Sequence, residues 1–369
     1  MKIAIVGAGN AGCITALHFA WYIKKAQENI EVELIHDPNL PSENVGQGAL
    51  LPQTELLWNA LDFDWHNNNI HATLKSGILY EGWGKKDKHF HPFPPNNMAV
   101  HYCPSILQEA ILKSGWFKVT EKSVCPKDVD ADYVFDCRGK PKDYSDYEEL
   151  INPTNAAILC KPNWDTSKAY WSRHVATPHG WSFIIPTVED SPARNGGLGY
   201  CYNSSITSKE TAEKNLLEMF DVEVMRHLHY RNYVAKNPVI DGRIFLQGNR
   251  LFFLEPLESS AIETYTWWSR LAYSFIITKY KTLKEIRSDI KRYIEQIQNF
   301  VLWHYQSGSR YNTPFWKYAK SLTFKDSEFD EYVKLSKSID NFSRSEYYSD
   351  LYGQWPPSSI KNWNQLNEK

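Results

Sequence analysis

The pattern of apolar and polar positions predicts an α/β chain that begins with a strand, a helix and a second strand. Residues 2–6 form a short apolar run of the kind found in buried strands. A helical pattern follows to about residue 27, with Ile14 and Leu17 on its buried face. The next strand is expected over residues 30–35. This order is typical of the βαβ unit that opens a parallel, Rossmann-like sheet.

Two pairs of residues have the spacing of capping boxes and predict where two later helices begin. They are Thr207 with Glu210, and Thr282 with Glu285. The second of these helices carries a stripe of apolar residues at helical spacing, and Gly308 should end it. Further helices are expected from residues 53, 104 and 261, and further strands over residues 72–83, 130–139, 180–186 and 197–202.

A GxGxxG turn at residues 7–12 lies between the first strand and the first helix. In such a turn the first glycine allows a tight bend, the second lets a pyrophosphate approach the backbone, and the third lets helix and strand pack closely. Its position therefore predicts a dinucleotide site. His36 and Asp37 stand where a ribose-binding acid is expected, and Asp37 is favoured because it is charged. The residues expected around the phosphates are Gly7, Gly9, Asn10, Ala11 and Gly12.

A second candidate site lies in the proline-constrained turn at residues 253–260, which carries two carboxylates and then two serines. A helical pattern follows from Ala261, and a helix N-terminus has a partial positive charge of roughly half a unit. Such a turn can aim backbone N–H groups at an anion, with Glu258 beside it. The alternative is an ordinary loop in which a serine caps the helix.

Composition narrows the classes of function. The chain has 369 residues, enough for two domains or one large α/β unit, and a net charge of −2 gives no reason to expect a nucleic-acid partner. Its six cysteines form no CxxC pair. His89 and His91 have no third ligand at suitable spacing, so no metal site is predicted. No apolar run is long enough to span a bilayer and no signal peptide precedes the first strand, so a cytoplasmic protein is expected.

Several motifs, in order along the chain, resemble those of the flavin-dependent halogenases, the family that includes the tryptophan halogenases. The most specific are FLEPLESS at residues 253–260 and the pair HY at 304–305, followed by TPFW at 313–316. Other segments similar to the family's motifs are VGQGALLP at 45–52, TLK at 73–75 with Trp83, HFHPF at 89–93, GWSFIIP at 180–186 and GYCYNS at 199–204.

The resemblance implies an α/β fold of the flavoprotein monooxygenase type. In this fold a Rossmann-like module with the GxGxxG turn binds FAD and is interleaved with a substrate-binding module. The FAD-binding module is expected to comprise residues 1–40, 97–140 and 239–281. The substrate-binding module, with a helical C-terminal part, is expected to comprise residues 41–96, 141–238 and 282–369.

The resemblance also implies an activity. Reduced FAD from a separate flavin reductase, dioxygen and a halide (chloride, bromide or iodide) would yield hypohalous acid. This oxidant would move through the protein to a lysine beside an electron-rich aromatic substrate of the indole or phenol type. Carried over, the lysine is Lys75, the carboxylate near the substrate is Glu258, and the halide site is the turn at Ser259 and Ser260.

Two further groups of residues follow from the same resemblance. The segment with Val45, Gly46 and Gln47 would pass close to the flavin ring. Bulky side chains would separate the substrate from the flavin, which distinguishes halogenation from direct hydroxylation. The residues expected in or beside this barrier are Trp181, Phe183, Pro186, His91 and Phe93.

Alternatives remain open at the sequence level. Lys75 could act as an ammonium that polarises hypohalous acid or, if burial lowers its pKa from about 10.4, as an amine that forms a haloamine. The chain could instead be an FAD-dependent aromatic hydroxylase, which needs neither Lys75 nor the barrier at Trp181. A flavin-binding protein without catalysis is a third possibility. The aromatic substrate, halide preference, regiochemistry and reductase are left undetermined, and a homo-oligomer is compatible with the sequence.

Overall fold

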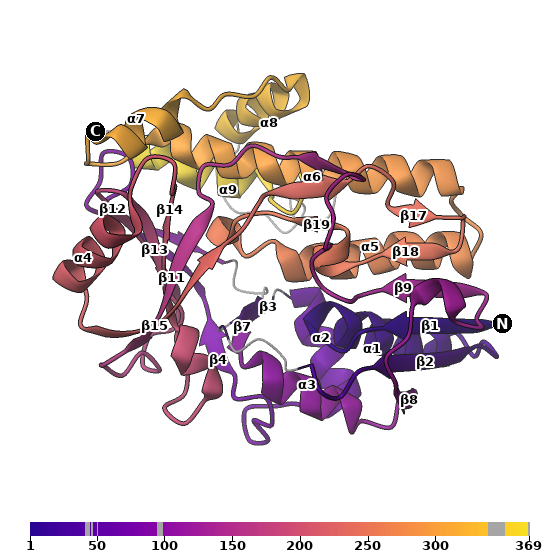
Figure 1. The fold of residues 1–369 in the computed structure, drawn as a ribbon. Helices are drawn as coiled ribbons and strands as arrows, with labels where there is room; N and C mark the ends of the chain where they lie inside the picture. The colour runs from indigo at the N-terminus through magenta and orange to yellow at the C-terminus, as the bar shows by residue number, and fades with distance from the viewer. Residues whose placement is uncertain (41–44, 46, 50, 94–98, 339–350, 368–369) are drawn as a thin grey trace.

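The computed structural model describes residues 1–40, 45, 47–49, 51–93, 99–338 and 351–367. Two large sheets organise the chain (Figure 1). A six-stranded sheet lies near the N-terminus at the right of the view, and a seven-stranded sheet lies at the left. The helices α5 (Ala261–Ile276) and α6 (Leu283–Ser307) pack against each other and run across this view, with α6 above α5.

The six-stranded sheet has the order β17-β18-β9-β1-β2-β8, and all its pairings are parallel except that of β17 with β18. Its central strands are apolar and buried, as expected where helices cover a parallel sheet. All six strands fall in the ranges expected for the FAD-binding module; the division into two modules stays a prediction. The bounds are β1 (Lys2–Val6), β2 (Glu31–His36), β8 (Lys118–Glu121), β9 (Tyr133–Asp136), β17 (Val239–Ile240) and β18 (Ile244–Leu246).

The seven-stranded sheet has the order β15-β11-β14-β13-β12-β5-β6 and is antiparallel except for the pair of β12 and β5. Two three-stranded antiparallel sheets, β3-β7-β4 and β10-β16-β19, accompany the large sheets. The bounds in the large sheet are β5 (Gly77–Glu81), β6 (Lys88–Pro92), β11 (Ala156–Pro162), β12 (Ser172–Thr177), β13 (Gly180–Ile184), β14 (Leu198–Tyr202) and β15 (Val222–His229). Those in the small sheets are β3 (Gln47–Ala49), β4 (Thr73–Lys75), β7 (Ala99–Tyr102), β10 (Tyr147–Glu149), β16 (Tyr233–Ala235) and β19 (Phe252–Phe253).

The predicted start and end of α6 are confirmed. Thr282 and Glu285 form a full capping box, and Gly308 ends the helix with a positive φ of 70°. The apolar stripe predicted along this helix is buried in the main core. The other helices are α1 (Asn10–Lys25), α2 (Leu51–Leu61), α3 (Pro104–Leu112), α4 (Lys209–Met219), α7 (Pro314–Ser321), α8 (Ser327–Ser338) and α9 (Pro357–Asn364), with short 3₁₀ turns that include η4 (Pro256–Glu258).

Two local predictions are wrong. The expected strand over residues 72–83 is divided between two sheets as β4 and β5, because Ser76 leaves the ladder and bonds to the carbonyl of Tyr170 through its N–H and its hydroxyl, both at 2.6 Å. The expected capping box at Thr207 is also displaced. Ser208 is the N-cap of α4 and accepts from the N–H of Thr211, since the N–H of Thr207 bonds to Asn203 in the preceding turn.

No helix among the described residues has both the length and the apolar character needed to cross a membrane. Within the same residues, no three side chains of the His, Cys, Asp and Glu types gather in a way that could bind a metal ion.

Candidate functional site

A cavity of about 1370 Å³ opens at the carboxyl ends of β1, β2 and β9, where parallel α/β sheets commonly bind ligands. From there it extends to the seven-stranded sheet. Gly7, Gly9, Asn10 and Ala11 line it. Gly12 is not part of the lining, because it lies behind the turn against Gly7.

The three glycines of the turn occupy three different environments. Gly7 has a φ of +110°, and a Cβ there would lie 2.6 Å from the carbonyl oxygen of Cys137. A Cβ on Gly12 would lie 1.8 Å from the carbonyl oxygen of Gly7, so only glycine lets the helix pack this closely. A Cβ on Gly9 would meet nothing within 4 Å. The residues therefore fit a dinucleotide, whose phosphates need open backbone at the second glycine.

The candidate ribose and ring contacts lie in the same cavity wall. His36 and Asp37 both line the cavity, and Asp37 Oδ1 also accepts two hydrogen bonds of 3.0 Å from Asn39. Val45 and Gln47 line it farther along. Gly46 lies outside the described residues.

Basic side chains at the cavity were not predicted from the sequence. Lys122, Lys140, Arg138 and Arg231 all line it. Arg138 is held by two hydrogen bonds to Asp136, of 2.8 and 2.9 Å. These positive charges suit an anionic ligand such as a pyrophosphate. The position of Arg138 at the end of the strand expected over residues 130–139 was the available signal.

The turn after β19 also faces the cavity. Ser259, Ser260 and Ala261 line it, and Ser259 has a left-handed backbone with a φ of 51°. The N–H of Ser259 bonds to the carbonyl of Pro256 at 3.0 Å, so this donor is already used. Ser260 is the N-cap of α5 but makes no capping hydrogen bond through its side chain, so the alternative of a serine cap is wrong for this residue. The positive end of a 16-residue helix therefore meets the cavity without a side-chain cap.

Lys75 is a buried amine at the end of β4, with only 3% of its surface exposed. Its Nζ lies 5.4 Å from the centre of the Phe93 ring, and a Cβ built on Gly48 would come within 3.0 Å of it. Among the described residues, Nζ has neither a hydrogen bond nor an ion pair. Burial lowers the pKa of Lys75 to about 8, although the negative charge of Glu258 opposes this shift.

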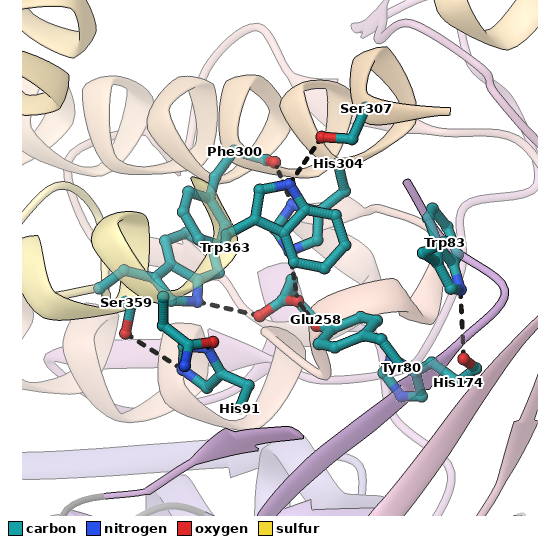
Figure 2. Close-up of polar contacts among 12 residues, drawn as sticks. Tyr80, Trp83, His91, His174, Glu258, Phe300, His304, Ser307, Ser359 and Trp363 are labelled. Carbon is teal, nitrogen blue, oxygen red and sulfur yellow. Dashed lines mark hydrogen bonds and ion pairs between the residues drawn. The ribbon is translucent and has the colours of Figure 1, made fainter. Parts of the chain in front are cut away.

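The Glu258 carboxylate is enclosed by donors, and its side chain is 7% exposed (Figure 2). Tyr80 donates its hydroxyl proton to Oε1, and His304 Nε2 lies 2.9 Å from the same oxygen. The indole N–H of Trp355 donates to Oε2 at 3.0 Å. Burial alone would raise the pKa of Glu258, but the charge and hydrogen bond of His304, together with the Tyr80 hydroxyl, lower it to about 2.

The contacts of His304 show that its ring carries a positive charge. Nδ1 lies 2.6 Å from the carbonyl oxygen of Phe300, which can only accept. Nε2 faces the Glu258 carboxylate, which also accepts. Because both nitrogens must donate, the ring is an imidazolium, and the two side chains form a buried ion pair. The Trp363 ring lies 3.9 Å from the imidazole and covers it (Figure 2).

The first carboxylate of the same turn, Glu255, was not singled out from the sequence. It is 1% exposed, lines the cavity, and accepts hydrogen bonds from Tyr305 at 2.7 and 2.9 Å and from Thr154 at 2.5 Å. Burial raises the pKa of Glu255 to about 7. The adjacent residues His304 and Tyr305 of α6 thus hold the two carboxylates of the turn, and the HY pair was the signal.

The bulky segment on β13 reaches the cavity at Phe183 and packs against other aromatic rings at Trp181. Phe183 lines the cavity and packs flat on Gly199, where a Cβ would be 2.1 Å from the ring. Trp181 is fully buried, 5.1 Å from the ring of His174, and does not line the cavity. The carbonyl oxygen of Pro186 accepts from the hydroxyl of Thr73 at 3.1 Å, which ties this segment to the strand of Lys75.

His91 lies on the side of the cluster that faces α9, and the ring of Phe93 lies 6.4 Å from that of His91. His91 Nδ1 lies 2.9 Å and His89 Nε2 lies 2.8 Å from the side-chain oxygen of Asn362, and His91 Nε2 lies 3.3 Å from the Ser359 hydroxyl. These contacts hold the C-terminal segment against β6. Burial lowers the pKa of His91 to about 4.

The chain is similar in sequence to tryptophan halogenases. A family model of tryptophan halogenases matches residues 2–115 and 118–358. The tryptophan 7-halogenase KtzQ of Kutzneria sp. (strain 744) is 23% identical over 226 residues, which cover 56% of this chain and 41% of that one. The tryptophan 7-halogenase RebH of Lentzea aerocolonigenes is 24% identical over 257 residues, 64% of this chain and 47% of that one. The matched stretches span less than half the length of these relatives.

Solved structures share the fold over the whole chain. A flavin-dependent halogenase from Xanthomonas campestris, Xcc4156, superposes with a TM-score of 0.80 at 17% identity and covers 100% of this chain and 88% of its own. A tryptophan halogenase from Shewanella frigidimarina gives a TM-score of 0.79 at 17% identity, with 100% and 89% coverage.

Proposed function

The chain belongs to the tryptophan halogenase family, and we propose that it uses reduced FAD, dioxygen and a halide to halogenate an electron-rich aromatic compound. The observation that carries this proposal is the environment of Lys75. Among the described residues, this buried amine has no hydrogen-bond partner, and it lies beside the Glu258 cluster. Trp181 and Phe183 would stand between that cluster and a cavity that fits a dinucleotide.

The residues of the cavity wall support the following contacts to FAD. Gly7 to Ala11 would hold the pyrophosphate at the start of α1, with Gly12 behind them, and His36 or Asp37 would bind the ribose. Val45, Gly46 and Gln47 would pass the flavin ring. When bound, reduced FAD supplies the electrons with which dioxygen and a halide yield hypohalous acid. A separate flavin reductase would deliver it in the reduced form.

The halide would bind where the turn at Ser259 and Ser260 meets the N-terminus of α5. A halide is a weak hydrogen-bond acceptor and needs converging donors at a positive site. The N–H of Ser259 is already bonded. We therefore assign the contact to the uncapped first turn of α5, with the two serine hydroxyls as further donors.

Lys75 would receive the halogen as an amine, because a pKa of about 8 leaves an appreciable neutral fraction near neutral pH. Glu258 would orient the reacting groups rather than accept a ring proton. Its pKa of about 2 makes it a weak base, and its oxygens already accept from Tyr80, His304 and Trp355.

The first test is product mass spectrometry with reduced FAD, dioxygen, bromide and a panel of indoles and phenols. We expect brominated products from the wild type. Lys75→Ala should abolish bromination while flavin oxidation continues. Lys88→Ala is the matched control, because that lysine is 68% exposed on β6 and should leave product formation unchanged. Hydroxylated products without any halide dependence would instead identify an aromatic hydroxylase.

The pH dependence of bromination tests the form of Lys75 that acts. With the flavin steps held saturating, the rate should rise with pH through a midpoint near 8, because deprotonation creates the amine. A rate that falls through the same midpoint would assign the ammonium form to the reaction and contradict the haloamine role.

A further inference from the structure

His174 lies between the cavity and the Glu258 cluster. On β12 it is paired in register with Tyr80 of β5 on one side and with Phe183 of β13 on the other. Residues paired in this way share one face of the sheet with Cβ atoms about 5 Å apart. Tyr80 donates to Glu258, and Phe183 lines the cavity. His174 lines the cavity as well, and Figure 2 shows it beside Tyr80, which belongs to the Glu258 cluster.

The imidazole of His174 lacks the partners that a buried ring normally has. The residue is 2% exposed, and its Nδ1 is enclosed without a hydrogen-bond partner among the described residues. The rings of Tyr80 and Trp181 lie 5.3 and 5.1 Å away, and the indole N–H of Trp83 donates to its backbone carbonyl at 3.1 Å. Buried polar groups are rarely left unpaired, so this one requires an explanation. Because Nδ1 is enclosed, Nε2 is the nitrogen that can meet a molecule in the cavity.

The ring is also suited to act as a nucleophile. Burial lowers the pKa of His174 to about 3, so the imidazole is neutral at neutral pH. The charge of Lys75 contributes to this lowering. Lys75 Nζ lies directly behind Gly48, which lines the same cavity.

We propose that His174 is a catalytic residue that takes the halogen from hypohalous acid in the cavity and passes it to Lys75. This proposal rests on the proposed function. Nε2 attacks the halogen, so that an N–halogen bond forms and the oxygen–halogen bond breaks. The neutral amine of Lys75 then attacks the halogen, which restores neutral imidazole and leaves a protonated haloamine. The departing hydroxide takes a proton from that nitrogen, which gives the haloamine and water. No further oxidant or reductant is required.

The first experiment uses the FAD-free Lys75→Ala protein, in which the halogen cannot pass from His174 to an amine at position 75, and it has an internal control. His18 on α1 is also 2% exposed, and burial lowers its pKa to about 3 as well, but it does not line the cavity. After brief exposure to one equivalent of hypobromous acid and a quench without thiols, peptide mass spectrometry should find the bromine isotope doublet on the peptide with His174. The peptide with His18 should remain unmodified. Equal modification of the two peptides, or none on that of His174, would overturn the proposal.

The second experiment follows the halogen during turnover. In His174→Gln, formation of oxidised halogen should continue. A larger share of this oxidised halogen should escape and be captured by a trap in solution. The yield of aromatic product per oxidised halogen should fall by about tenfold. His66→Gln, at an exposed position, is the control. An unchanged partition in His174→Gln would exclude the imidazole as a carrier. If the wild type forms no oxidised halogen at all, the proposed function fails. This outcome differs from failure of the His174 proposal, in which oxidised halogen forms but its partition is unchanged.

Discussion

Glu255 and Glu258 lie three residues apart in one turn, and both side chains are buried. Their pKa values nevertheless shift in opposite directions. The partners of Glu255 are the neutral hydroxyls of Thr154 and Tyr305, so burial dominates and its pKa rises to about 7. Glu258 faces the imidazolium of His304, and its pKa falls to about 2. The comparison shows that depth of burial does not by itself set the charge of a carboxyl group; the charge of the facing side chain does.

The largest expected effect is the loss of the ion pair. His304→Gln should lower the free energy of unfolding by roughly 3–5 kcal/mol, because it leaves the Glu258 carboxylate buried without a countercharge. Tyr305→Phe is the matched control on the neighbouring residue and should cost about 1–3 kcal/mol, the range for one lost buried hydrogen bond. Urea unfolding at pH 7 measures both. Equal losses of unfolding free energy in the two variants would show that the Glu258–His304 pair contributes no more than the Glu255–Tyr305 pair.

The next effect is a difference in how stability depends on pH. The folded pKa of Glu255 lies above its ordinary value of 4.5, so the folded state holds more protons between pH 4.5 and 7, and stability falls as pH rises through that window. The folded pKa of Glu258 lies below 4.5, so stability falls as pH drops from 4.5 to 2. Each of these two pKa shifts changes the free energy of unfolding by about 3 kcal/mol across its pH window.

Two isosteric variants separate these windows. Relative to the wild type, Glu255→Gln should lose the decline between pH 4.5 and 7, and Glu258→Gln should lose the decline below pH 4.5. Unfolding curves collected from pH 3 to pH 8 test both, and the two difference profiles should not overlap. A single shared window would show that the two carboxyl groups titrate as one unit.

The smallest expected effect comes from removing one donor at each carboxylate. Trp355→Phe removes the N–H that donates to Glu258 and keeps the ring on Phe300, while Thr154→Val removes a hydroxyl that donates to Glu255. Each should cost about 1 kcal/mol in unfolding free energy. Trp355→Phe should also raise the pKa of Glu258 and move its acid transition to higher pH. An unmoved transition would show that His304 and Tyr80 alone hold the carboxylate.

Features that depend on residues close together along the chain could be predicted from the amino-acid sequence. The GxGxxG turn, the capping box at Thr282 and the end of α6 at Gly308 are local patterns with local physical causes, and each has the expected geometry. Thr207 was mistaken for an N-cap because a preceding turn uses its N–H. The order of motifs also identified the family, because that order is preserved along the chain.

Which side chains face one another depends on the packing of distant elements and could not be predicted from the sequence. Glu258 meets Tyr80, His304 and Trp355 across separations of 46 to 178 residues in sequence, and nothing in the turn itself indicates which of its two carboxylates obtains the charged partner. The same holds for His174. No local sequence pattern distinguishes it, and its neighbours Tyr80 and Phe183 follow only from the pairing of the strands. Electrostatic character depends on distance in space, and the packing of α6 and of the C-terminal segment against both sheets sets those distances.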